Sequence, residues 1–488
     1  MVLISCLLLF CLVVVCFSYW YKRPKGFPPG PRGIPFLGII PRLGNFPEKS
    51  LFKWSKMYGP VMSLRMGRKD WVSLNDYDSI YKALSKQHTK FSGRPVLPVF
   101  AQFNQGSGIV RIDYAALWKS QRKFGLNTLR GFGVGKRSME ERILKETTFL
   151  NDWIRSQNGN AFSPVVVLHK ATASNIASII YGKRFEYNDK TFNRLIDSIT
   201  GVYDDADANF ALQCMNLAPV LMHVPPFSKL NALILEKYRT ILEICQQIVE
   251  QHKKTFQEDE LRDFIDAFLK EMYEGNAGFT DKQLLHYLRH LLGAGTDTTA
   301  TMLNWSLIFL LHYPEVQKKL RNEAMKIVGR STPVKMTFKS DMPYTKAFIE
   351  EVLRYRTIVP LAVAHKTNEN SELNGHVIPK DTAVLVNLWA VHNDPDYWDE
   401  PEIFKPERFI DDQGRFVKSS HVIPFSLGPR HCLGEQLAQM EIFIFLVSLI
   451  QNFEFVPDPN SGELPPLDSP SSGFIFTPPP YTLAAKEL

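Results

Sequence analysis

The spacing of apolar and polar residues along this chain predicts a mainly helical protein with a small β-rich part. Apolar residues recur at helical spacing over four long segments, which are 139–154, 230–256, 281–311 and 435–450. Shorter stretches with the composition of strands are 60–66, 71–74 and 383–388. The predicted fold class is therefore mainly α, with a large helical domain and a small β-rich region.

The N-terminal segment is a separate unit in this pattern. Residues 2–21 are almost wholly apolar, and about twenty helical residues span ~30 Å, the thickness of a bilayer core. Lys22, Arg23 and Lys25 follow at once, and positive charge on that flank places the rest of the chain in the cytosol. A cleaved signal peptide would have basic residues before the apolar run and a small-residue cleavage site after it, and neither is seen. We therefore expect one retained membrane anchor over residues 1–21.

Closely spaced prolines follow the anchor. The stretch 27–35 contains several of them, which is typical of a stiff, extended spacer. We predict a basic and proline-rich hinge over residues 22–38. Beyond it the sequence shows no linker, repeat or low-complexity tract, so residues 39–488 are expected to form one large catalytic domain.

Composition narrows the class of protein. The chain has 488 residues, 45% of them hydrophobic, and a formal net charge of +7. This charge is mild for the length and too diffuse for a nucleic-acid arm, but it suits an acidic partner or an anionic membrane surface. The six cysteines show neither a C-x-x-C pair nor a disulfide-like spacing, which indicates a reducing compartment.

Cys432 is the first candidate for chemistry. It lies in Phe425-Ser-Leu-Gly428-Pro-Arg430-His-Cys432-Leu-Gly434, just ahead of a predicted helix whose free N–H groups and dipole favour a thiolate. Gly428 and Gly434 remove side chains where the loop must turn and where a flat cofactor must come close. Arg430 is a permanent cation suited to a carboxylate. A single thiolate suits an axial haem ligand better than a zinc or iron–sulfur site.

The longest predicted helix carries a polar turn, Ala294-Gly-Thr-Asp297-Thr298-Thr299. Glycine costs about 1 kcal/mol in a helix interior, and threonine side chains hydrogen-bond back to the preceding turn. We expect this turn to loosen the helix and to leave room for a small ligand. The alcohol of Thr298 beside the carboxylate of Asp297 makes a candidate proton relay.

Two other pairs combine polar side chains at helical spacing. Glu351 and Arg354 stand three residues apart on one helix face, an arrangement that is common and usually solvated. Trp118 and Arg122 stand one turn apart, and both are hydrogen-bond donors only, which suits a carboxylate.

Together, and in this order, these segments resemble the motifs of the cytochrome P-450 superfamily, the haem-thiolate monooxygenases. The cysteine segment matches the pattern Phe-x-x-Gly-x-Arg-x-Cys-x-Gly at all five fixed positions. The polar turn resembles the oxygen-activation motif, and Glu351-Val-Leu-Arg354 with Pro406-Glu-Arg408-Phe409 resembles a buried charge network of the family. The resemblance covers the whole chain and is closest to microsomal family-two members.

The resemblance implies a role for each residue. Cys432 would be the axial ligand of haem b (iron protoporphyrin IX), Thr298 would hydrogen-bond dioxygen, and Asp297 would help to deliver protons. The structural network would comprise Glu351, Arg354 and Arg408, beneath the cysteine loop. The other residues expected to contact haem are Arg430, Trp118, Arg122, Arg94, His365, Phe425, Gly428, Gly434 and Ala294.

By the same resemblance, the protein is expected to insert one oxygen atom into a fatty acid, steroid or xenobiotic. Electrons would come from NADPH through a separate flavoprotein reductase, with cytochrome b5 as a further partner, at the endoplasmic reticulum membrane. Lys119, Lys123 and Lys136 are candidates for the docking face. One alternative is a haem-thiolate isomerase or dehydratase that acts on a peroxide without a reductase, and another is a haem protein without turnover. The Asp297–Thr298 pair disfavours both.

Some patterns leave the function open. His286 and His290 have metal-ligand spacing but lack the adjacent glutamate of a metalloprotease, so we expect them on a polar helix face. Segments 96–109 and 211–224 are expected to line an apolar substrate pocket. The proline-broken segment 212–227 fits equally a second patch that enters the membrane and a buried corner.

Overall fold

The structure, a computed structural model, describes residues 23–488 except for residues 36, 68, 105, 201–205 and 472. The predicted anchor over residues 1–21 lies outside the described residues. Among the described helices, none is both long and apolar enough to cross a membrane.

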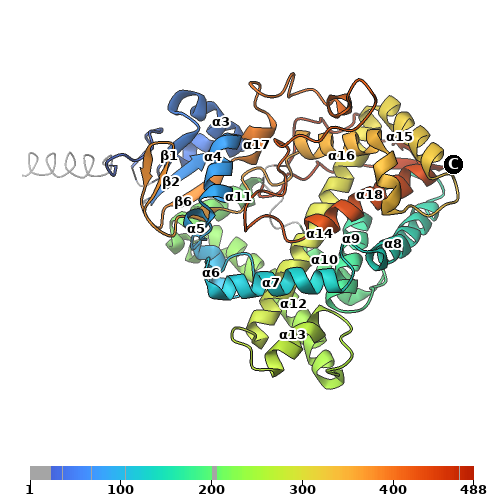
Figure 1. Cartoon of the computed structure of the whole chain (residues 1–488), viewed down its shortest axis with the longest axis horizontal. Coiled ribbons are helices and arrows are strands. Elements are labelled where there is room, and N and C mark those ends of the chain that lie inside the picture. Colours follow the sequence, from blue (N-terminus) through green and yellow to red (C-terminus); the bar gives the residue numbers. More distant parts are fainter. Residues whose placement is uncertain (1–22, 36, 68, 105, 201–205, 472) are drawn as a thin grey trace, which may run out of the picture.

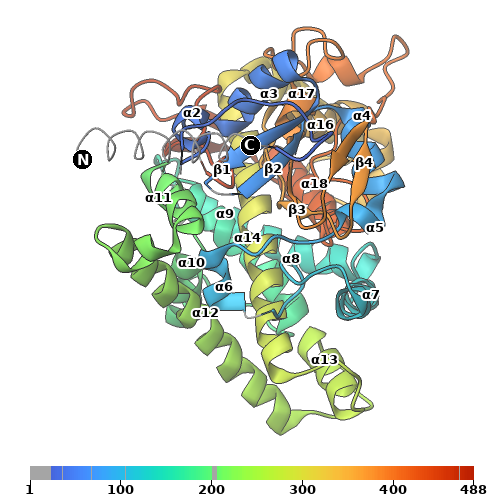
Figure 2. The same cartoon turned by 90° about the vertical axis from the view of Figure 1, so that its left-hand side faces the viewer.

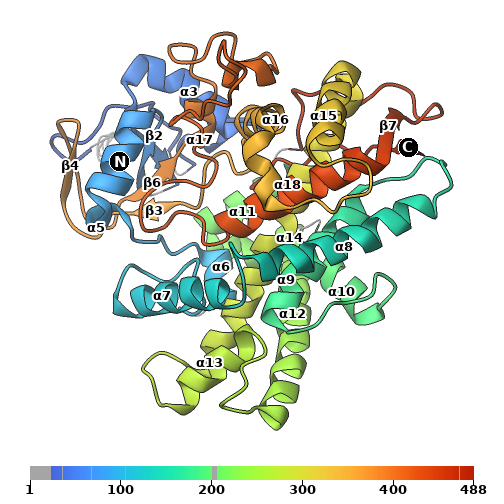
Figure 3. The same cartoon turned by 45° about the vertical axis from the view of Figure 1, so that its right-hand side comes forward.

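A central helix organises the molecule. Helix α14 (Asp281–His312) runs through its middle and packs against α9 (Val165–Ile180), α12 (Phe227–Thr255) and α18 (Glu435–Asn452) (Figures 1, 2 and 3). Residues from all four helices join the largest hydrophobic cluster. Helices α12, α14 and α18, together with α8 (Arg137–Arg155), confirm the four long segments predicted from helical spacing.

The remaining helical elements surround this centre. The α-helices are α2 (Ile40–Leu43), α3 (Pro47–Tyr58), α4 (Tyr77–Tyr81), α5 (His88–Phe91), α6 (Pro98–Asn104), α7 (Ala116–Gly131), α10 (Lys190–Ile199), α11 (Ala206–Leu217), α13 (Phe264–Tyr273), α15 (Pro314–Ile327), α16 (Pro343–Tyr355) and α17 (Leu388–His392). The short π- and 3-10 turns are η1 (Lys82–Lys86), η2 (Pro219–His223), η3 (Met336–Asp341) and η4 (Pro406–Phe409).

The sheets are small, as the sequence predicts. The largest has the order β1-β2-β6-β3, with β2 parallel to β6, and lies beside α3 and α4 (Figure 1). Its strands are β1 (Val61–Met66), β2 (Lys69–Leu74), β3 (His365–Lys366) and β6 (Ala383–Val386). The two-stranded sheets pair β4 (Ser371–Leu373) with β5 (His376–Ile378), and β7 (Phe453–Pro457) with β8 (Leu483–Glu487).

The strand predicted over 383–388 is too long. Strand β6 ends at Val386, because the side chain of Asn387 accepts a hydrogen bond from the N–H of Ala390 and caps α17. An asparagine cap of this kind starts a helix where apolar composition alone favours a strand.

The proline-rich segment reaches the sheet. The N–H of Ser63 in β1 donates to the carbonyl of Pro29 at 2.8 Å, and Phe27 and Ile39 are buried in the clusters around the sheet. Part of the segment predicted as a hinge, residues 22–38, therefore lies against the domain that follows it.

The segment 212–227 is a buried corner in its first part, and entry of its second part into a membrane stays a prediction. Leu212 and Met215 are buried against Val99 and Phe103 of α6, whereas Val220 and Val224 farther along are 66% and 45% exposed. The first part is a buried corner, and the second part leaves apolar side chains on the surface.

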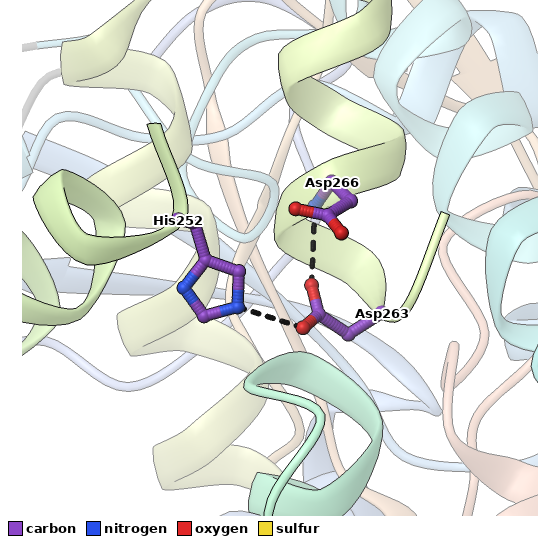
Figure 4. Close-up of side chains that lie close together, drawn as sticks. All are labelled: His252, Asp263 and Asp266. Atoms are coloured by element: carbon purple, nitrogen blue, oxygen red, sulfur yellow. Dashed lines mark hydrogen bonds and ion pairs between the residues drawn. The ribbon is translucent and has the colours of Figure 1, made fainter. Parts of the chain in front are cut away.

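Helices α12 and α13 meet through a histidine–carboxylate cap. Figure 4 shows the carboxylate of Asp263 between the ring of His252, 2.7 Å away, and the N–H of Asp266 in the first turn of α13. Both oxygens of Asp266 accept hydrogen bonds from Arg262. The three side chains lie close enough for a metal ion, but these contacts already occupy the carboxylates, so we interpret the group as a helix cap.

This cap predicts a pH-dependent contribution to stability. Burial lowers the pKa of His252, but the hydrogen bond and charge of Asp263 outweigh it, so that the pKa lies above 6.5. The pair therefore stabilises the fold fully below the unfolded pKa, and this contribution is lost as pH rises through the folded pKa. We expect His252→Gln to lower the thermal unfolding temperature more at about pH 6 than at about pH 8.

The control is His223→Gln, which replaces an exposed histidine on η2. We expect its unfolding temperature to stay near that of the unaltered protein at both pH values. An equal effect of His252→Gln at the two pH values would contradict the ion pair.

Candidate active site

The loop before α18 holds Cys432 by its backbone. The N–H of Cys432 donates to the carbonyl of Phe425 at 2.9 Å and closes the loop. Ser426 and Gly428 have φ values of 63° and 74°, in the left-handed region that favours glycine. The loop ends at Gly434, the N-cap residue of α18.

The two glycines differ in what they permit. A Cβ on Gly428 would lie 1.9 Å from the carbonyl oxygen of Leu84, so that only glycine fits, as its positive φ also requires. A Cβ on Gly434 would meet only the Cys432 sulfur, at an ordinary 4.0 Å. The approach of a flat cofactor expected at Gly434 concerns no protein atom and stays a prediction.

The thiol of Cys432 lies in a dehydrated environment. Burial raises its pKa, while the N–H of Gly434 and the charge of Arg122 act in the opposite direction. The sequence predicted that the helix terminus would favour the thiolate, and the structure shows that desolvation outweighs it. The side chain nevertheless exposes surface, so the sulfur is open to a ligand, and a metal bond would hold it as the thiolate.

Two of the predicted donors, Arg430 and Arg94, form a buried cationic group. Arg430 donates to the carbonyls of Ser92 and Ile112 at 3.0 and 2.8 Å, and its guanidinium lies 4.2 Å from the ring centroid of Trp118. Arg94 donates to the carbonyl of Val363 at 2.7 Å. Burial lowers the pKa of Arg430 to about 9 and that of Arg94 well below its ordinary value, where repulsion between the two adds to the effect.

The other predicted donors reach different partners. Arg122 donates to the carbonyl of His431 at 2.7 Å, directly before Cys432, so that it ties α7 to the cysteine loop. The ring Nδ1 of His365 lies 2.8 Å from the carbonyl of Phe91, an acceptor, and therefore carries a proton. Burial and the charges of Arg94 and Arg430 lower the pKa of His365, and the neutral ring then leaves Nε2 as an acceptor.

The charge balance fits an anionic cofactor. Asp113 is the carboxylate that acts on both Arg94 and Arg430, but it is half exposed and accepts a hydrogen bond from Lys366 at 2.8 Å. Buried cations are stable when a carboxylate compensates them. The two carboxylate arms of haem would supply this charge, and an anion there would also favour a protonated His365. The residues present therefore fit haem.

The polar turn of α14 presents a surface of its own. Ala294 is exposed and Thr298 half-buried, although Leu292 and Ala300 on either side are fully buried. The hydroxyl of Thr298 donates to the carbonyl of Ala294 at 2.8 Å. The helix is continuous here, so the predicted loosening is wrong. The small side chain of Ala294, rather than a break, leaves the room.

The carboxylate of Asp297 has a partner that the sequence did not reveal. It lies 3.1 Å from Nε2 of His169 on α9, and Nδ1 of that ring lies 2.7 Å from the carbonyl of Val165. His169 stands in an apolar helix without a motif, 128 residues before Asp297. No local pattern signals such a pair.

Glu351 is the centre of the predicted charge network. It accepts hydrogen bonds from Arg354 at 2.7 and 2.8 Å and from Arg408 at 3.1 Å. Glu351 and Arg354 are fully buried. The three predicted members therefore meet, with opposite charges in direct contact.

The network reaches the cysteine loop through His392. Arg354 donates to the carbonyl of His392 at 2.9 Å, and the N–H of Ile423, just before the loop, donates to Nε2 of His392 at 2.8 Å. Burial lowers the pKa of His392 to about 3, so the ring is neutral and Nδ1–H faces Thr357 at 2.7 Å. The sequence missed His392 because no spacing links it to either element.

His286 and His290 are buried, which contradicts the polar face predicted for them. Nδ1 of His286 lies 2.7 Å from the hydroxyl of Tyr238, and Nδ1 of His290 accepts from the N–H of Ile109 at 3.1 Å. Burial lowers both pKa values, that of His286 to about 4. They join α14 to neighbouring segments, because other elements cover the central helix at these two positions.

Comparison with known proteins agrees with this geometry. The family model described as "Cytochrome P450" matches residues 28–485. The mouse (Mus musculus) protein "Cytochrome P450 2U1" is 35% identical over 506 residues, which are 98% of this chain and 94% of that protein. The human (Homo sapiens) "Cytochrome P450 2J2" is 37% identical over 453 residues, 91% of this chain and 88% of that protein. The rat (Rattus norvegicus) "Cytochrome P450 2D3" is 36% identical over 477 residues, which are 96% of this chain and 93% of that protein.

The charge network predicts a large loss of stability when its centre is neutralised. In Glu351→Gln the side chain keeps its size, but the buried guanidinium of Arg354 loses its counter-charge. We expect unfolding to become easier by about 3–5 kcal/mol, measured by chemical denaturation together with haem retention. Glu402→Gln changes an exposed glutamate in the adjacent loop and should have little effect. Equal stability of the two variants would contradict the network.

Proposed function

The chain belongs to the cytochrome P450 family and is a haem-thiolate monooxygenase; from this premise we propose that it inserts one atom of dioxygen into a lipophilic substrate, with electrons from NADPH delivered by a separate flavoprotein reductase. The observation that carries the proposal is the loop of Cys432 beside the buried cations Arg94 and Arg430. Haem b is the cofactor that this arrangement of donors suits.

The substrate is expected to be a fatty acid, a steroid or a xenobiotic. The two segments predicted to line its pocket meet in one apolar cluster, in which Val99 and Phe103 contact Leu212 and Met215. Tyr238 also belongs to this cluster. The apolar lining supports a lipophilic substrate.

Each part of the site has a definite task in this function. Haem held by a thiolate supplies the activation of dioxygen. Cys432 is kept in place by the carbonyl of Phe425, and Arg430 and Arg94 would hold the two carboxylates of haem. The hydroxyl of Thr298 donates a hydrogen bond to the carbonyl of Ala294, so that its oxygen can accept one, and Asp297 stands next to it in the chain.

Electron transfer requires a partner at the surface. Lys119, Lys123 and Lys136 lie on α7 and directly after it, and all three are exposed. They support a basic docking face for a flavoprotein reductase, with cytochrome b5 as a second candidate. The predicted anchor over residues 1–21 would hold the catalytic domain, residues 39–488, on the cytosolic side of the endoplasmic reticulum membrane.

The proposal is tested with purified protein, reductase, NADPH and isotopically labelled dioxygen, incubated with a whole lipid extract. We expect products that carry one labelled oxygen atom, detected by mass spectrometry. Cys432→Ala should lose these products, and also the long-wavelength Soret band of the reduced carbonyl complex. An unchanged band in that variant would refute the ligand assignment. A normal band and electron transfer in the unaltered protein, without labelled products, would favour peroxide rearrangement by an isomerase.

The position of the Thr298 hydroxyl predicts a role in coupling, the fraction of NADPH oxidation that yields product rather than peroxide. Thr298→Ala removes the hydroxyl near the site of proton delivery, so we expect several-fold more peroxide to be released per NADPH consumed. The measurement is the amount of peroxide released divided by the amount of NADPH oxidised. Thr298→Ser retains the hydroxyl and should stay close to the unaltered protein. Coupling that does not change in Thr298→Ala would remove this residue from the relay.

A further inference from the structure

The pair of His169 and Asp297 points to more than a structural contact. We propose that the two side chains together hold one transferable proton, and that His169 is a positioning residue for proton delivery at the α14 turn. The inference rests on the proposed function, because it assigns a source to the proton that the reaction consumes.

The protonation of the pair follows from its contacts. Nδ1 of His169 faces the carbonyl oxygen of Val165, which only accepts, so Nδ1 carries a hydrogen. Nε2 faces Oδ1 of Asp297 at 3.1 Å. A neutral ring would then point its Nε2 lone pair at an ionised carboxylate, which is repulsive. One further proton, on Nε2 or on the carboxyl, turns the contact into a hydrogen bond.

The surroundings keep this proton in place. The side chains of His169 and Asp297 are 7% and 13% exposed, too little for water to satisfy an unpaired charge. One turn along α9, the hydroxyl of Thr172 donates to the carbonyl of Thr296 at 3.0 Å and fixes the two helices together. The imidazole therefore cannot move away from the carboxyl without a shift of α9 relative to α14.

The position of the pair gives the proton a destination. Asp297 directly precedes Thr298 in the chain. The hydroxyl of Thr298 donates a hydrogen bond to the carbonyl of Ala294, so its oxygen can accept a hydrogen bond. When the pair releases its proton to a water that hydrogen-bonds the Thr298 hydroxyl oxygen, the bond to hydrogen in the pair breaks and one O–H bond forms on the water. That water passes one of its own protons on to the reaction that consumes it and stays neutral. The pair is left with one negative charge and with the repulsive contact between Nε2 and the carboxylate, which favours the uptake of a new proton from solvent.

The first test reads the proton directly in the resting ferric protein. Infrared difference spectra between the unaltered protein and Asp297→Asn isolate the Asp297 carboxyl from other buried carboxyls such as Glu441, whose pKa is raised to about 8. Nitrogen NMR of labelled histidine, assigned by His169→Gln, reports the state of the ring. We expect either a protonated carboxyl at Asp297 or a doubly protonated ring at His169. An ionised carboxylate beside a neutral ring would overturn the proposal.

The second test measures product formed per NADPH in His169→Gln, Asp297→Asn and the double variant. Glutamine and asparagine preserve a hydrogen bond between the helices but hold no transferable proton. We expect about a tenfold fall in each single variant, the effect of losing an acid that water partly replaces. The double variant should fall no further, because both changes remove the same proton.

Thr172→Val is the matched control, because Thr172 also joins α9 to α14 but carries no such proton. Coupling in this variant should equal that of the unaltered protein. Unchanged coupling in His169→Gln, with a normal carbonyl Soret band and labelled product, would reject the inference and leave the monooxygenase function standing. Absence of labelled product in the unaltered protein would instead reject the function itself.

Discussion

The burial of charged side chains around the Cys432 loop is the constraint on which the rest of the structure depends. A charge inside a protein is stable only when an opposite charge or several hydrogen bonds compensate it. Below the loop, Glu351 compensates Arg354 and Arg408. Beside the loop, Arg430 and Arg94 donate their hydrogen bonds to backbone carbonyls. Among the described residues, the carboxylate that acts on both is Asp113, which is half exposed and bound to Lys366. That arrangement favours an anionic cofactor.

The same two arginines also bring together the segments that would surround the cofactor. Arg430 draws the carbonyls of Ser92 and Ile112 together, and Arg94 adds that of Val363 from before β3. Segments far apart in the chain therefore meet at one place, held by the groups that would bind the cofactor.

Local patterns predicted much of this architecture, and long-range contacts explain what they missed. Helical spacing identified the long helices, and the fixed spacing of the cysteine loop identified Cys432 and its family, because both depend on neighbouring residues. His169 and His392 escaped notice because their partners lie on other elements. Arg122 was assigned to the cofactor from its spacing to Trp118, and it also donates to the carbonyl of His431. Helical spacing indicates a face of the helix and not every partner on it.

The buried ionisable groups near the site use three different ways to avoid an uncompensated charge. Glu351 is paired with arginines, whose charge is permanent, so that network has no proton to give and acts as a support. His392 is kept neutral, with its ring between Thr357 and the N–H of Ile423, and serves only to connect. His169 and Asp297 differ because imidazole and carboxyl groups, unlike a guanidinium, can both bind and release a proton, and one proton held between them turns their contact into a hydrogen bond. The same need to compensate a buried charge therefore gives Glu351 a fixed ion pair and gives the Asp297 pair a proton that it can transfer.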